Sequence, residues 1–425
     1  MTFTTAKDIT PIQAYQRIEE TGLYSCHRVH IVDVRERHEI ETFGKIEASY
    51  NVPFSVYESN RDMFTEALMD LVDKEATVII YCRSGRRSGI VSKYAAEELG
   101  FKDVYNVVGG LNQWTDDHLP IKTHANDHSP WVHTIFEHET ATAQYIVTDI
   151  VSKESYIIDP VLDYDPLDAV VLPRTAKLIL EHVKRFGLNV TKIIDTHVHA
   201  DHLTAAIYLK EQLPSNPEFC IGSNVVEVQK TFLERYNLSA TAFTMDHFDR
   251  LVKEEDTWIL GDTIHCSVIA TPGHTPACMS YRIGDAAFVG DTLFMPDIGT
   301  ARCDFPGGSA EQMYTSIHKM YKLWPNDIRI YVGHDYPPAA SARTHKVMTL
   351  LGVHKKMNKM IDDEKSMDEY VKLRSERDAN LRVPRFIHPS LQVNLRGGLL
   401  PQEEPSVHGK ATPQTFIKVP IRFQS

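Results

Sequence analysis

Residues 195–202 read DTHVHADH, and they follow a run of apolar residues that is typical of a buried strand. The segment places His197, His199, Asp201 and His202 within six positions of the chain. Removing four such groups from water together is costly unless a partner compensates for it. A metal ion is such a partner, so the segment predicts a metal site at the end of a strand.

Three more donors occupy similar positions further along the chain. His274 lies in ATPGHT, Asp291 in VGDT and His334 in VGHDY, and each follows a strand-like run. A single histidine of this kind is more often structural than functional. Seven donors in this order are not explained by packing alone, and they indicate a metal centre.

The order of these donors resembles the metallo-β-lactamase superfamily, whose fold is an αββα sandwich with the metal site at one edge. The resemblance implies that all seven donors belong to the metal site. Most members use two zinc ions to activate a bridging hydroxide for hydrolysis. A smaller group holds one iron by two histidines and one aspartate, which leaves positions open for a substrate and O₂. The same donors occur in both groups, so they leave the identity of the metal open.

Other segments favour the iron-dependent group. Three segments closely resemble the persulfide dioxygenases: residues 196–206 (THVHADHLTAA), 294–317 (FMPDIGTARCDFPGGSAEQMYTSI) and 333–339 (GHDYPPA). The similarity extends over residues 131–425. Glyoxalase II, the nearest hydrolase family, lacks the ARCDFPGG-type segment. The resemblance implies oxidation of glutathione persulfide by O₂ to sulfite and glutathione. The alternative that stays open is a dinuclear zinc thioester hydrolase similar to glyoxalase II.

The resemblance to persulfide dioxygenases also implies roles for individual residues. It implies one Fe(II) per chain, ligated by His197, His274 and Asp291. Arg302 matches the family arginine that contacts glutathione, and a guanidinium group suits a carboxylate. Tyr336 is a second expected substrate contact. The remaining four donors would orient the metal ligands, and they are His199, Asp201, His202 and His334.

A second chemical signal lies at residues 78–89, VIIYCRSGRRSG. The strand-like run ends at Cys82, and Arg83, Arg86 and Arg87 follow within five positions. Gly85 permits a tight turn, and backbone N–H groups at the start of the next helix lower the pKa of a thiol and stabilise an anion. The loop is shorter than that of tyrosine phosphatases, so it suits a smaller group such as a sulfane sulfur.

This part of the chain resembles the single-domain rhodanese family over residues 5–120. CRSGRRS fits the family's C-x-x-G-x-R-[ST] loop, and residues 33–54 and 107–114 (VVGGLNQW) fit its other signatures. The resemblance implies that Cys82 carries a persulfide and that the arginines attract anionic sulfur compounds such as thiosulfate or sulfite. The sequence leaves the direction of sulfur transfer open.

The spacing of apolar residues predicts an α/β protein with two domains. Short β-branched runs first alternate with helical segments, which is typical of a parallel sheet flanked by helices. A larger, mixed pattern follows, as the resemblance to the αββα sandwich implies. The polar residues 118–130 mark the seam, and we expect a rhodanese domain at 1–122, a linker at 123–130 and a metallo-β-lactamase-like persulfide dioxygenase domain at 131–425. The highly charged residues 355–380 are expected to form a solvated helical face.

Charge and composition disfavour several classes of partner. The formal net charge of −12 argues against nucleic acid and anionic membranes, and no apolar run is long enough for a membrane-spanning helix. The first residues, MTFTTAKDITP, do not resemble a secretory signal, and six scattered cysteines without a CxxC pair favour free thiols. We therefore expect a cytoplasmic enzyme that acts on small sulfur compounds, and a homo-oligomer is left open.

Overall fold

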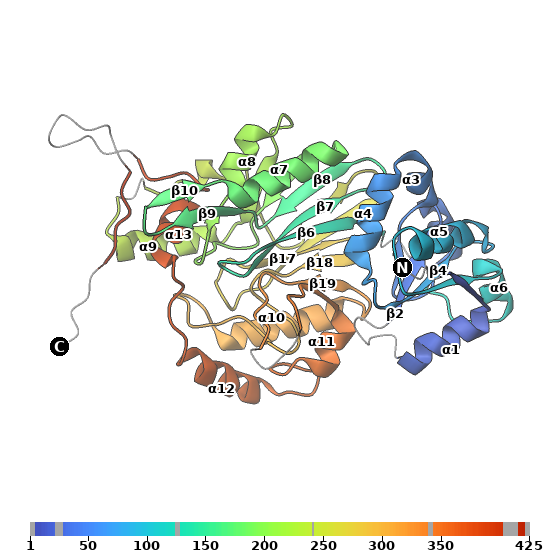
Figure 1. Cartoon of the computed structure of the whole chain (residues 1–425). Coiled ribbons are helices and arrows are strands. Elements are labelled where there is room, and N and C mark those ends of the chain that lie inside the picture. Colours follow the sequence, from blue (N-terminus) through green and yellow to red (C-terminus); the bar gives the residue numbers. More distant parts are fainter. Residues whose placement is uncertain are drawn as a thin grey trace.

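The computed structural model describes residues 5–21, 29–123, 128–239, 242–338, 343–402 and 415–420. Two α/β units lie side by side in it, and the N-terminal unit occupies the right-hand side of Figure 1. Cys26 lies outside the described residues, whereas the other five cysteines are free thiols in buried positions.

The N-terminal unit is built on a five-stranded, parallel sheet with the strand order β1-β5-β4-β2-β3. Side chains alternate between its faces. Val78 and Ile80 of the central strand pack in one apolar cluster with α4 and α5, and Ile79 and Tyr81 pack in another with α1 and α6. The strands are β1 (Lys7–Ile9), β2 (Val29–Asp33), β3 (Ser49–Asn51), β4 (Thr77–Tyr81) and β5 (Asp103–Val107). The helices are α1 (Pro11–Thr21), α2 (Arg37–Phe43), α3 (Phe54–Ser59), α4 (Arg61–Leu71), α5 (Arg86–Glu97) and α6 (Gly110–Asp116).

The C-terminal unit contains two six-stranded sheets that pack face to face. The first has the order β14-β13-β11-β8-β7-β6, and the second has the order β15-β16-β17-β18-β19-β20. The first consists of β6 (Trp131–Glu137), β7 (Thr142–Thr148), β8 (Glu154–Ile158), β11 (Asn189–Ile194), β13 (Glu218–Gly222) and β14 (Arg250–Val252). The second consists of β15 (Thr257–Leu260), β16 (Ile264–Ala270), β17 (Met279–Ile283), β18 (Ala286–Phe288), β19 (Arg329–Tyr331) and β20 (Met348–Leu350).

Helices cover the outer faces of both sheets, as Figure 1 shows. Val147 and Phe288 belong to the apolar cluster between the sheets, whereas Ile193 faces outward into a cluster with α7, α8 and α9. Helix α10 covers the other sheet through Met313 and Ile317. The helices are α7 (Arg174–Phe186), α8 (Ala206–Gln212), α9 (Val225–Tyr236), α10 (Ala310–Leu323), α11 (Leu351–Met357), α12 (Met367–Asp378) and α13 (Ile387–Asn394), with a short 3₁₀ helix at Met245–His247. These layers confirm the predicted fold class, a parallel α/β unit followed by an αββα sandwich.

A small third sheet brings the last helix close to the loops of the sandwich. It has the order β10-β9-β12, and its strands are β9 (Val161–Asp165), β10 (Val170–Leu172) and β12 (Leu203–Thr204). Helix α13 packs on β12. Strand β12 directly follows the DTHVHADH segment, so α13 lies against the candidate metal loop.

The charged segment 355–380 does not form a solvated face along its whole length. Helix α12 buries Tyr370, Arg374 and Asp378, which are four residues apart and therefore share one side of the helix. Tyr370 Oη lies 2.9 Å from Thr300 Oγ1, and Arg374 Nη2 donates to Asp378 Oδ1 at 2.5 Å. The prediction was wrong for this side because an internal ion pair compensates for burying the charges.

The two units share a continuous packed interface along α4 and β6 (Figure 1). Leu68 of α4 belongs to the same apolar cluster as Trp131 of β6 and Phe186 of α7. Asp70 at the end of α4 accepts a hydrogen bond from Trp131 Nε1 at 2.7 Å and lies 3.0 Å from His133 Nδ1. The N-terminal unit is therefore packed against the sandwich, not only connected to it by the chain.

Asp285 forms a buried polar junction at the same interface. It is 6% exposed, and its carboxylate accepts hydrogen bonds from Ser129 Oγ and Arg329 Nη2, both at 2.5 Å. Lys45 of the N-terminal unit places its Nζ 3.8 Å from the same carboxylate. Residues 124–127 of the predicted linker lie outside the described residues, whereas its last residues, 128–130, are buried between the units.

Within the described ranges, no helix combines the length and the apolar character that crossing a membrane requires.

Candidate functional site

The DTHVHADH segment forms an irregular loop at the carboxyl end of β11. Strands β8 and β11 are parallel neighbours, so their carboxyl ends meet at the same edge of the sheet. Asp159, directly after β8, accepts hydrogen bonds from the Thr196 N–H at 2.7 Å and from Thr196 Oγ1 at 2.9 Å. This buried carboxylate therefore fixes the start of the loop. Asp159 was not among the donors predicted from the sequence.

Asn394 of α13 holds the other end of the loop. Its Nδ2 donates to the carbonyl oxygens of His199 and His202, both at 2.8 Å. Its Oδ1 accepts from the Thr204 N–H at 2.8 Å. One buried amide thus satisfies three backbone groups of the loop, although it lies 190 residues further along the chain than Thr204.

His197, His274 and Asp291 come together in one cluster, and His274 and Asp291 line a cavity. Their ligand atoms all lie within 4.8 Å of one another, and His274 Nε2 is 3.7 Å from Asp291 Oδ2. The three residues follow β11, β16 and β18, respectively. Both rings are buried, with 1% of His197 and 5% of His274 exposed. The structure therefore brings together the three residues that were predicted to hold Fe(II).

Hydrogen bonds at Nδ1 prepare both histidines for metal binding. His274 Nδ1 lies 2.8 Å from the carbonyl oxygen of Arg302, which can only accept, so Nδ1 carries the proton. His197 Nδ1 lies 3.1 Å from Thr196 Oγ1, whose own proton goes to Asp159, so this Nδ1 also donates. Each Nε2 atom is left with a free lone pair. Burial, reinforced by the neighbouring histidines, lowers the pKa of His197 well below its usual value and keeps the ring neutral.

His199, Asp201 and His202 form a second group of ligand atoms, again within 4.8 Å of one another. His202 Nδ1 lies 3.1 Å from the carbonyl oxygen of Leu203 and therefore donates to it. His202 Nε2 and His199 Nδ1 are buried and have no hydrogen-bond partner among the described residues. Buried nitrogen atoms without a protein partner fit the neighbourhood of a metal ion, because native proteins rarely leave such atoms unsatisfied.

Asp159 and His334 connect this group with its surroundings. His199 Nε2 lies 3.0 Å from Asp159 Oδ1; burial opposes a charge on His199, but Asp159 outweighs burial and raises the pKa of the ring to about 10. His334 Nε2 lies 3.4 Å from a carboxylate oxygen of Asp201 and 3.4 Å from one of Asp291. His334 therefore bridges the two groups of ligand atoms.

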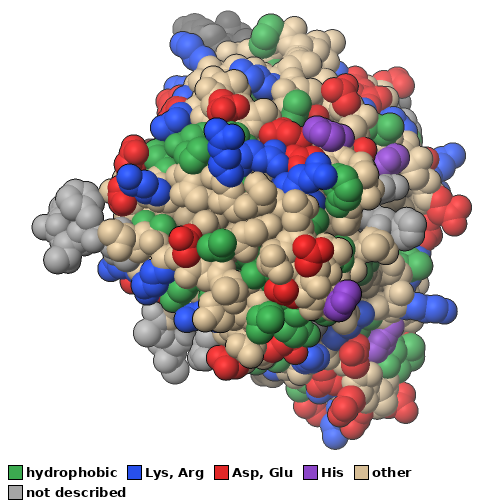
Figure 2. Space-filling view, turned by 90° about the vertical axis from the view of Figure 1, so that its right-hand side faces the viewer, with side chains coloured by type: hydrophobic (Ala, Val, Ile, Leu, Met, Phe, Trp, Pro, Cys, Tyr) green, Lys and Arg blue, Asp and Glu red, His purple; other side chains and the backbone are tan. Residues whose placement is uncertain are grey.

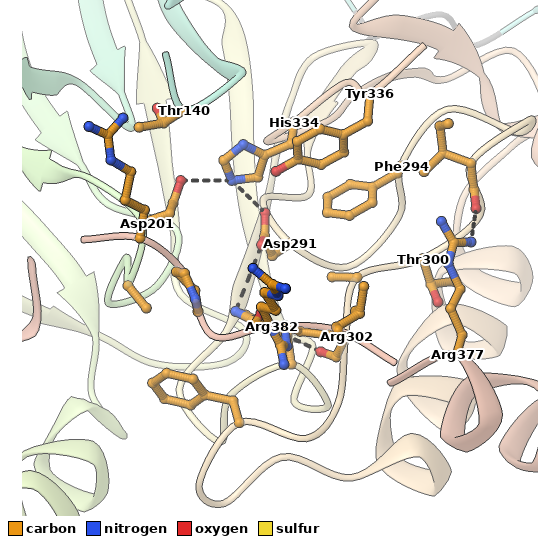
Figure 3. A pocket seen from close by; sticks show the side chains of 18 of the residues that line it. Thr140, Asp201, Asp291, Phe294, Thr300, Arg302, His334, Tyr336, Arg377 and Arg382 are labelled. Atoms are coloured by element: carbon orange, nitrogen blue, oxygen red, sulfur yellow. Dashed lines mark hydrogen bonds and ion pairs between the residues drawn. The ribbon is translucent and has the colours of Figure 1, made fainter. Parts of the chain in front are cut away.

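A cavity of about 440 Å³ opens over these residues (Figure 3). Tyr336 is part of its wall, and its ring is nearly parallel to that of His334, with 5.7 Å between the centroids. The other apolar side chains of the wall include Phe294, Ile298, Phe305, Leu381 and Phe386. Such a site suits a ligand with an apolar body and a few polar groups.

Arg302 also lines the cavity, but the protein itself binds its guanidinium group. Nε and Nη2 donate to the two carboxylate oxygens of Asp304, each at 2.6 Å. Nη1 donates to the carbonyl oxygen of Arg382 at 2.6 Å. The edge that forms a bidentate pair with a carboxylate is thus already occupied by Asp304.

Four further arginines line this cavity, and none of them was predicted from the sequence. They belong to α12 and to the segment that follows it: Arg374, Arg377, Arg382 and Arg385. Arg377 Nη1 donates to the carbonyl oxygen of Ile298 at 2.8 Å, and Arg385 Nη1 pairs with Glu139 at 3.1 Å. Acidic side chains therefore lie at the bottom of the cavity, and arginines lie in its wall.

Cys82 lies directly after β4, at the start of the turn that leads into α5. It is 1% exposed, and the Gly85 N–H donates to its Sγ at 3.2 Å. Ser88 Oγ lies 3.4 Å from Sγ and 2.7 Å from Asn106 Oδ1, so its single proton can serve only one of them at a time. Burial raises the pKa of Cys82, but hydrogen bonds from the Ser88 hydroxyl and from the backbone of Ser84, Gly85 and Ser88 outweigh it and lower the pKa.

Helix α6 closes the turn from the other side. The Leu111 N–H donates to the carbonyl oxygen of Cys82 at 2.9 Å, and the Asn112 N–H donates to that of Arg83 at 3.0 Å. Gly110 has a φ of +57°, and a Cβ atom there would lie 2.3 Å from the Cys82 carbonyl oxygen. Only glycine fits this position, which accounts for the VVGGLNQW signature.

The three arginines of the turn have different surroundings. Arg87 forms a bidentate pair with Glu39, with distances of 2.7 and 2.8 Å. Arg83 and Arg86 are exposed, and Arg83 stacks on Phe43 with 4.7 Å to the ring centroid. On the face that the N-terminal unit contributes, lysine and arginine side chains gather in a band beside hydrophobic ones (Figure 2). The charge available to an incoming anion is therefore that of Arg83 and Arg86.

Two family models match the chain, one after the other. The model described as rhodanese-like domain matches residues 11–117, and the model described as metallo-beta-lactamase superfamily matches residues 141–334.

Three related proteins cover most of the second part of the chain. Glyoxylase B2 of Dictyostelium discoideum is 42% identical over 290 residues, which are 68% of this chain and 95% of that protein. A beta-lactamase hydrolase-like protein of Xylella fastidiosa is 37% identical over 380 residues, 86% of this chain and 82% of that protein. The mitochondrial persulfide dioxygenase ETHE1 of Homo sapiens is 29% identical over 267 residues, 62% of this chain and 87% of that protein.

Proposed function

Because this chain belongs to the metallo-beta-lactamase superfamily and carries a rhodanese-like domain ahead of the sandwich, we propose that it is a sulfur-metabolising enzyme with two sites. The sandwich oxidises glutathione persulfide with O₂ and water to sulfite and glutathione. The rhodanese-like domain transfers sulfane sulfur through Cys82.

The observation that carries the oxidation is the group of two histidines and one carboxylate at the base of the cavity. The free Nε2 lone pairs of His197 and His274, together with the Asp291 carboxylate, suit one Fe(II) ion. A ferrous ion held by such a set supplies the chemistry that lets O₂ react with a bound substrate. His199 is paired with Asp159, and this favours a role in orienting the loop over one as a ligand of the same ion.

The residues of the chain shape the surroundings of the substrate and orient the metal ligands. Phe294, Phe305 and Tyr336 form an aromatic part of the cavity wall, which would limit the access of water to a bound substrate. The carbonyl oxygen of Arg302 holds the His274 ring through Nδ1, and Thr196 holds the His197 ring in the same way. Both rings are thus kept in the tautomer that a metal requires.

The sulfur-transfer step uses the thiolate of Cys82, which the lowering of its pKa by the surrounding hydrogen bonds favours. Its thiolate attacks the outer sulfur of thiosulfate, the S–S bond breaks and sulfite leaves, so that Cys82 becomes a persulfide. The thiolate of glutathione then takes the outer sulfur, which gives glutathione persulfide and restores the Cys82 thiolate. In the opposite direction the same cysteine would combine sulfite with the sulfur of a persulfide to form thiosulfate.

A second candidate function is a dinuclear zinc hydrolase of glutathione thioesters. The group formed by His199, Asp201 and His202, with its partnerless buried nitrogens, favours it. So do the names of two of the related proteins, a glyoxylase and a hydrolase-like protein.

Metal analysis and oxygen uptake separate the two functions. Protein purified without added metal should contain about one iron per chain, and it should consume O₂ when glutathione persulfide is added. Two zinc ions per chain, together with hydrolysis of a glutathione thioester and no oxygen uptake by the iron-loaded protein, would establish the hydrolase instead.

A further inference from the structure

Helix α2 lies between the sandwich and the turn that starts at Cys82, and its two sides have different partners. Arg37 and Glu41 share one side, because residues four positions apart lie close together on a helix. Glu39 and Phe43 share the opposite side, since two positions along a helix correspond to roughly half a turn. The first side contacts the sandwich and the end of the linker, and the second contacts arginines of the Cys82 turn.

Arg37 joins α2 to the sandwich where two of its hairpin turns meet. Its Nη2 lies 2.5 Å from Asp149 Oδ1, and its Nη1 donates to Thr263 Oγ1 at 3.3 Å. Asp149 lies between β7 and β8, and its carboxylate also accepts from Ser152 Oγ at 2.8 Å. It packs against Gly261 in the turn between β15 and β16, where a Cβ atom would lie 1.8 Å from Oδ2. The side chains of Arg37 and Asp149 are 11% and 0% exposed, so salt screens this ion pair only weakly.

The opposite side of α2 holds two of the three arginines that follow Cys82. Glu39 accepts two hydrogen bonds from Arg87, at 2.7 and 2.8 Å. Phe43 lies beneath the guanidinium group of Arg83, at 4.7 Å from its ring centroid. A bidentate pair and a cation–π contact both restrict where a guanidinium group lies. The position of α2 therefore determines how these two arginines are arranged beside Cys82.

We propose that Arg37 is a positioning residue for sulfur transfer at Cys82, and that its ion pair with Asp149 lets the sandwich hold the arginines of the Cys82 turn in place. This inference rests on the proposed function of the rhodanese-like domain. It deepens that function, because it makes the sandwich part of the support of the sulfur-transfer site. The two sites would then be separate in their chemistry, but one domain would be needed for the full activity of the other.

Each of the two arginines depends on α2 in its own way. Arg83 is exposed and can attract an anionic donor such as thiosulfate, and Phe43 keeps its guanidinium group over the turn. Arg87 lies in the first turn of α5, and the start of α5 provides N–H donors to Cys82 Sγ. Glu39 anchors that first turn through Arg87. A shift of α2 would therefore displace both the charge and the donors that serve the thiolate.

A substitution in the sandwich tests the inference by its effect on the other unit. In the full chain, Asp149→Asn keeps the shape of the side chain but removes the counter-charge of Arg37. It should lower kcat/KM for thiosulfate roughly 2- to 30-fold, the range expected for coupling between two sites. Arg37→Met should have a similar effect, and Arg37→Lys should retain part of the activity because it keeps the charge. Oxygen uptake with preformed glutathione persulfide should not change, because Asp149 follows the end of β7, whereas Thr142 at its start pairs with His334 beside the cavity.

Lys122→Met is the matched control for a weakened interface. Lys122 Nζ forms another ion pair between the units, with the two carboxylate oxygens of Asp327 at 2.8 and 2.9 Å, and this pair does not involve the side chains of α2. The variant should lose stability in urea unfolding but keep kcat/KM for thiosulfate within about twofold of wild type. Equal losses of kcat/KM in Lys122→Met and Arg37→Met would mean that sulfur transfer depends on the interface as a whole, and the inference would be overturned.

The pKa of Cys82 provides a measurement that does not depend on turnover. The pH dependence of its alkylation by iodoacetamide should show a higher pKa in Asp149→Asn than in wild type, because a displaced first turn of α5 stabilises the thiolate less well. An ion pair that only holds the units together would leave this pKa unchanged, and that result would refute the positioning role. If the wild-type protein transfers no sulfur from thiosulfate, the proposed function of this domain is wrong, whereas the alkylation experiment still decides about Arg37.

A double-mutant cycle tests whether Arg37 acts through α2. Glu39→Gln removes the charge that holds Arg87, so Arg37→Met should cost less in that background than in wild type. The loss of kcat/KM in the double variant should therefore be smaller than the product of the two single losses. Independent, fully multiplicative losses would show that Arg37 does not act through the opposite side of the helix.

Discussion

Replacing Asn394 by alanine tests how the candidate metal loop is held in place. The side chain is 3% exposed and makes three hydrogen bonds of 2.8 Å, to the carbonyl oxygens of His199 and His202 and to the Thr204 N–H. Each such bond contributes on the order of 1 kcal/mol to stability, so the free energy of unfolding should fall by about 2–4 kcal/mol. Mutating a residue that hydrogen-bonds and orients metal ligands typically lowers metal affinity by about 10- to 100-fold, and we expect the iron affinity to fall by that factor.

Asn358→Ala is the matched control. Asn358 is also buried, at 1% exposed, and its side chain bonds the carbonyl oxygen of Gly299 and the N–H groups of Met360 and Ile361 at 3.0–3.2 Å. Its partners lie outside the DTHVHADH loop, so Asn358→Ala should cost similar stability and leave the iron affinity near that of wild type. Urea unfolding of the metal-free proteins gives the first quantity, and competition with a chelator gives the second. Equal iron affinities for the two variants, at equal losses of stability, would refute the view that Asn394 organises the loop.

Four other predictions follow from the sites and the interface. Asp291→Ala should lose bound iron and oxygen uptake but keep sulfur transfer, and metal analysis beside a thiosulfate sulfurtransferase assay checks both. Cys82→Ser should lose sulfur transfer from thiosulfate and still consume O₂ with preformed glutathione persulfide. Loss of both activities in a folded, iron-loaded variant would contradict the assignment of separate sites. Ser88→Ala should raise the pKa of Cys82, because the hydroxyl is the largest of the hydrogen-bond effects that lower it, and the pH dependence of alkylation by iodoacetamide measures the shift. Asp285→Asn should cost about 3–5 kcal/mol at neutral pH, because it leaves Arg329 buried without its counter-charge. Burial raises the pKa of Asp285, but the charge of Arg329 outweighs burial and lowers this pKa. The stabilisation by the Asp285 charge is therefore present above the unfolded pKa of about 4 and is lost as the pH falls through the folded pKa. Urea unfolding at several pH values should show that the difference in stability between variant and wild type shrinks in acid.

The metal donors could be predicted from the sequence because each one follows a strand. His197 follows β11 of the first sheet, whereas His274 and Asp291 follow β16 and β18 of the second, and these strand ends meet at one edge of the sandwich. Cys82 could be located for the same reason, since it directly follows the central strand β4. In both cases the local sequence pattern, a polar or thiol side chain directly after an apolar strand, is enough to predict where the residue lies.

The partners of these residues could not be predicted, because long-range contacts decide them. Arg87 was expected to attract anionic sulfur compounds together with Arg83 and Arg86, yet Glu39, which lies 48 residues earlier, holds its guanidinium group. The segment containing Arg374 looked like a solvated helix, because charged residues surround it in the sequence. Only the spacing of Tyr370, Arg374 and Asp378 on one side of α12 could have indicated a buried face.

The packed interface between the two units has a kinetic consequence. Residues 131–133 at the start of β6 contact α4, whereas Glu139 and Thr140, beyond the end of the same strand, line the cavity. A strand of seven residues spans roughly 20 Å, so a rhodanese-like domain fixed at its start cannot carry sulfur to the cavity as a swinging arm does. On the proposed function, each persulfide made at Cys82 first becomes a solute, and other thiols in solution compete for it. Fusion would then guarantee equal numbers of the two catalysts, while the flux between them depends on the concentration of free glutathione, as it would for two separate enzymes.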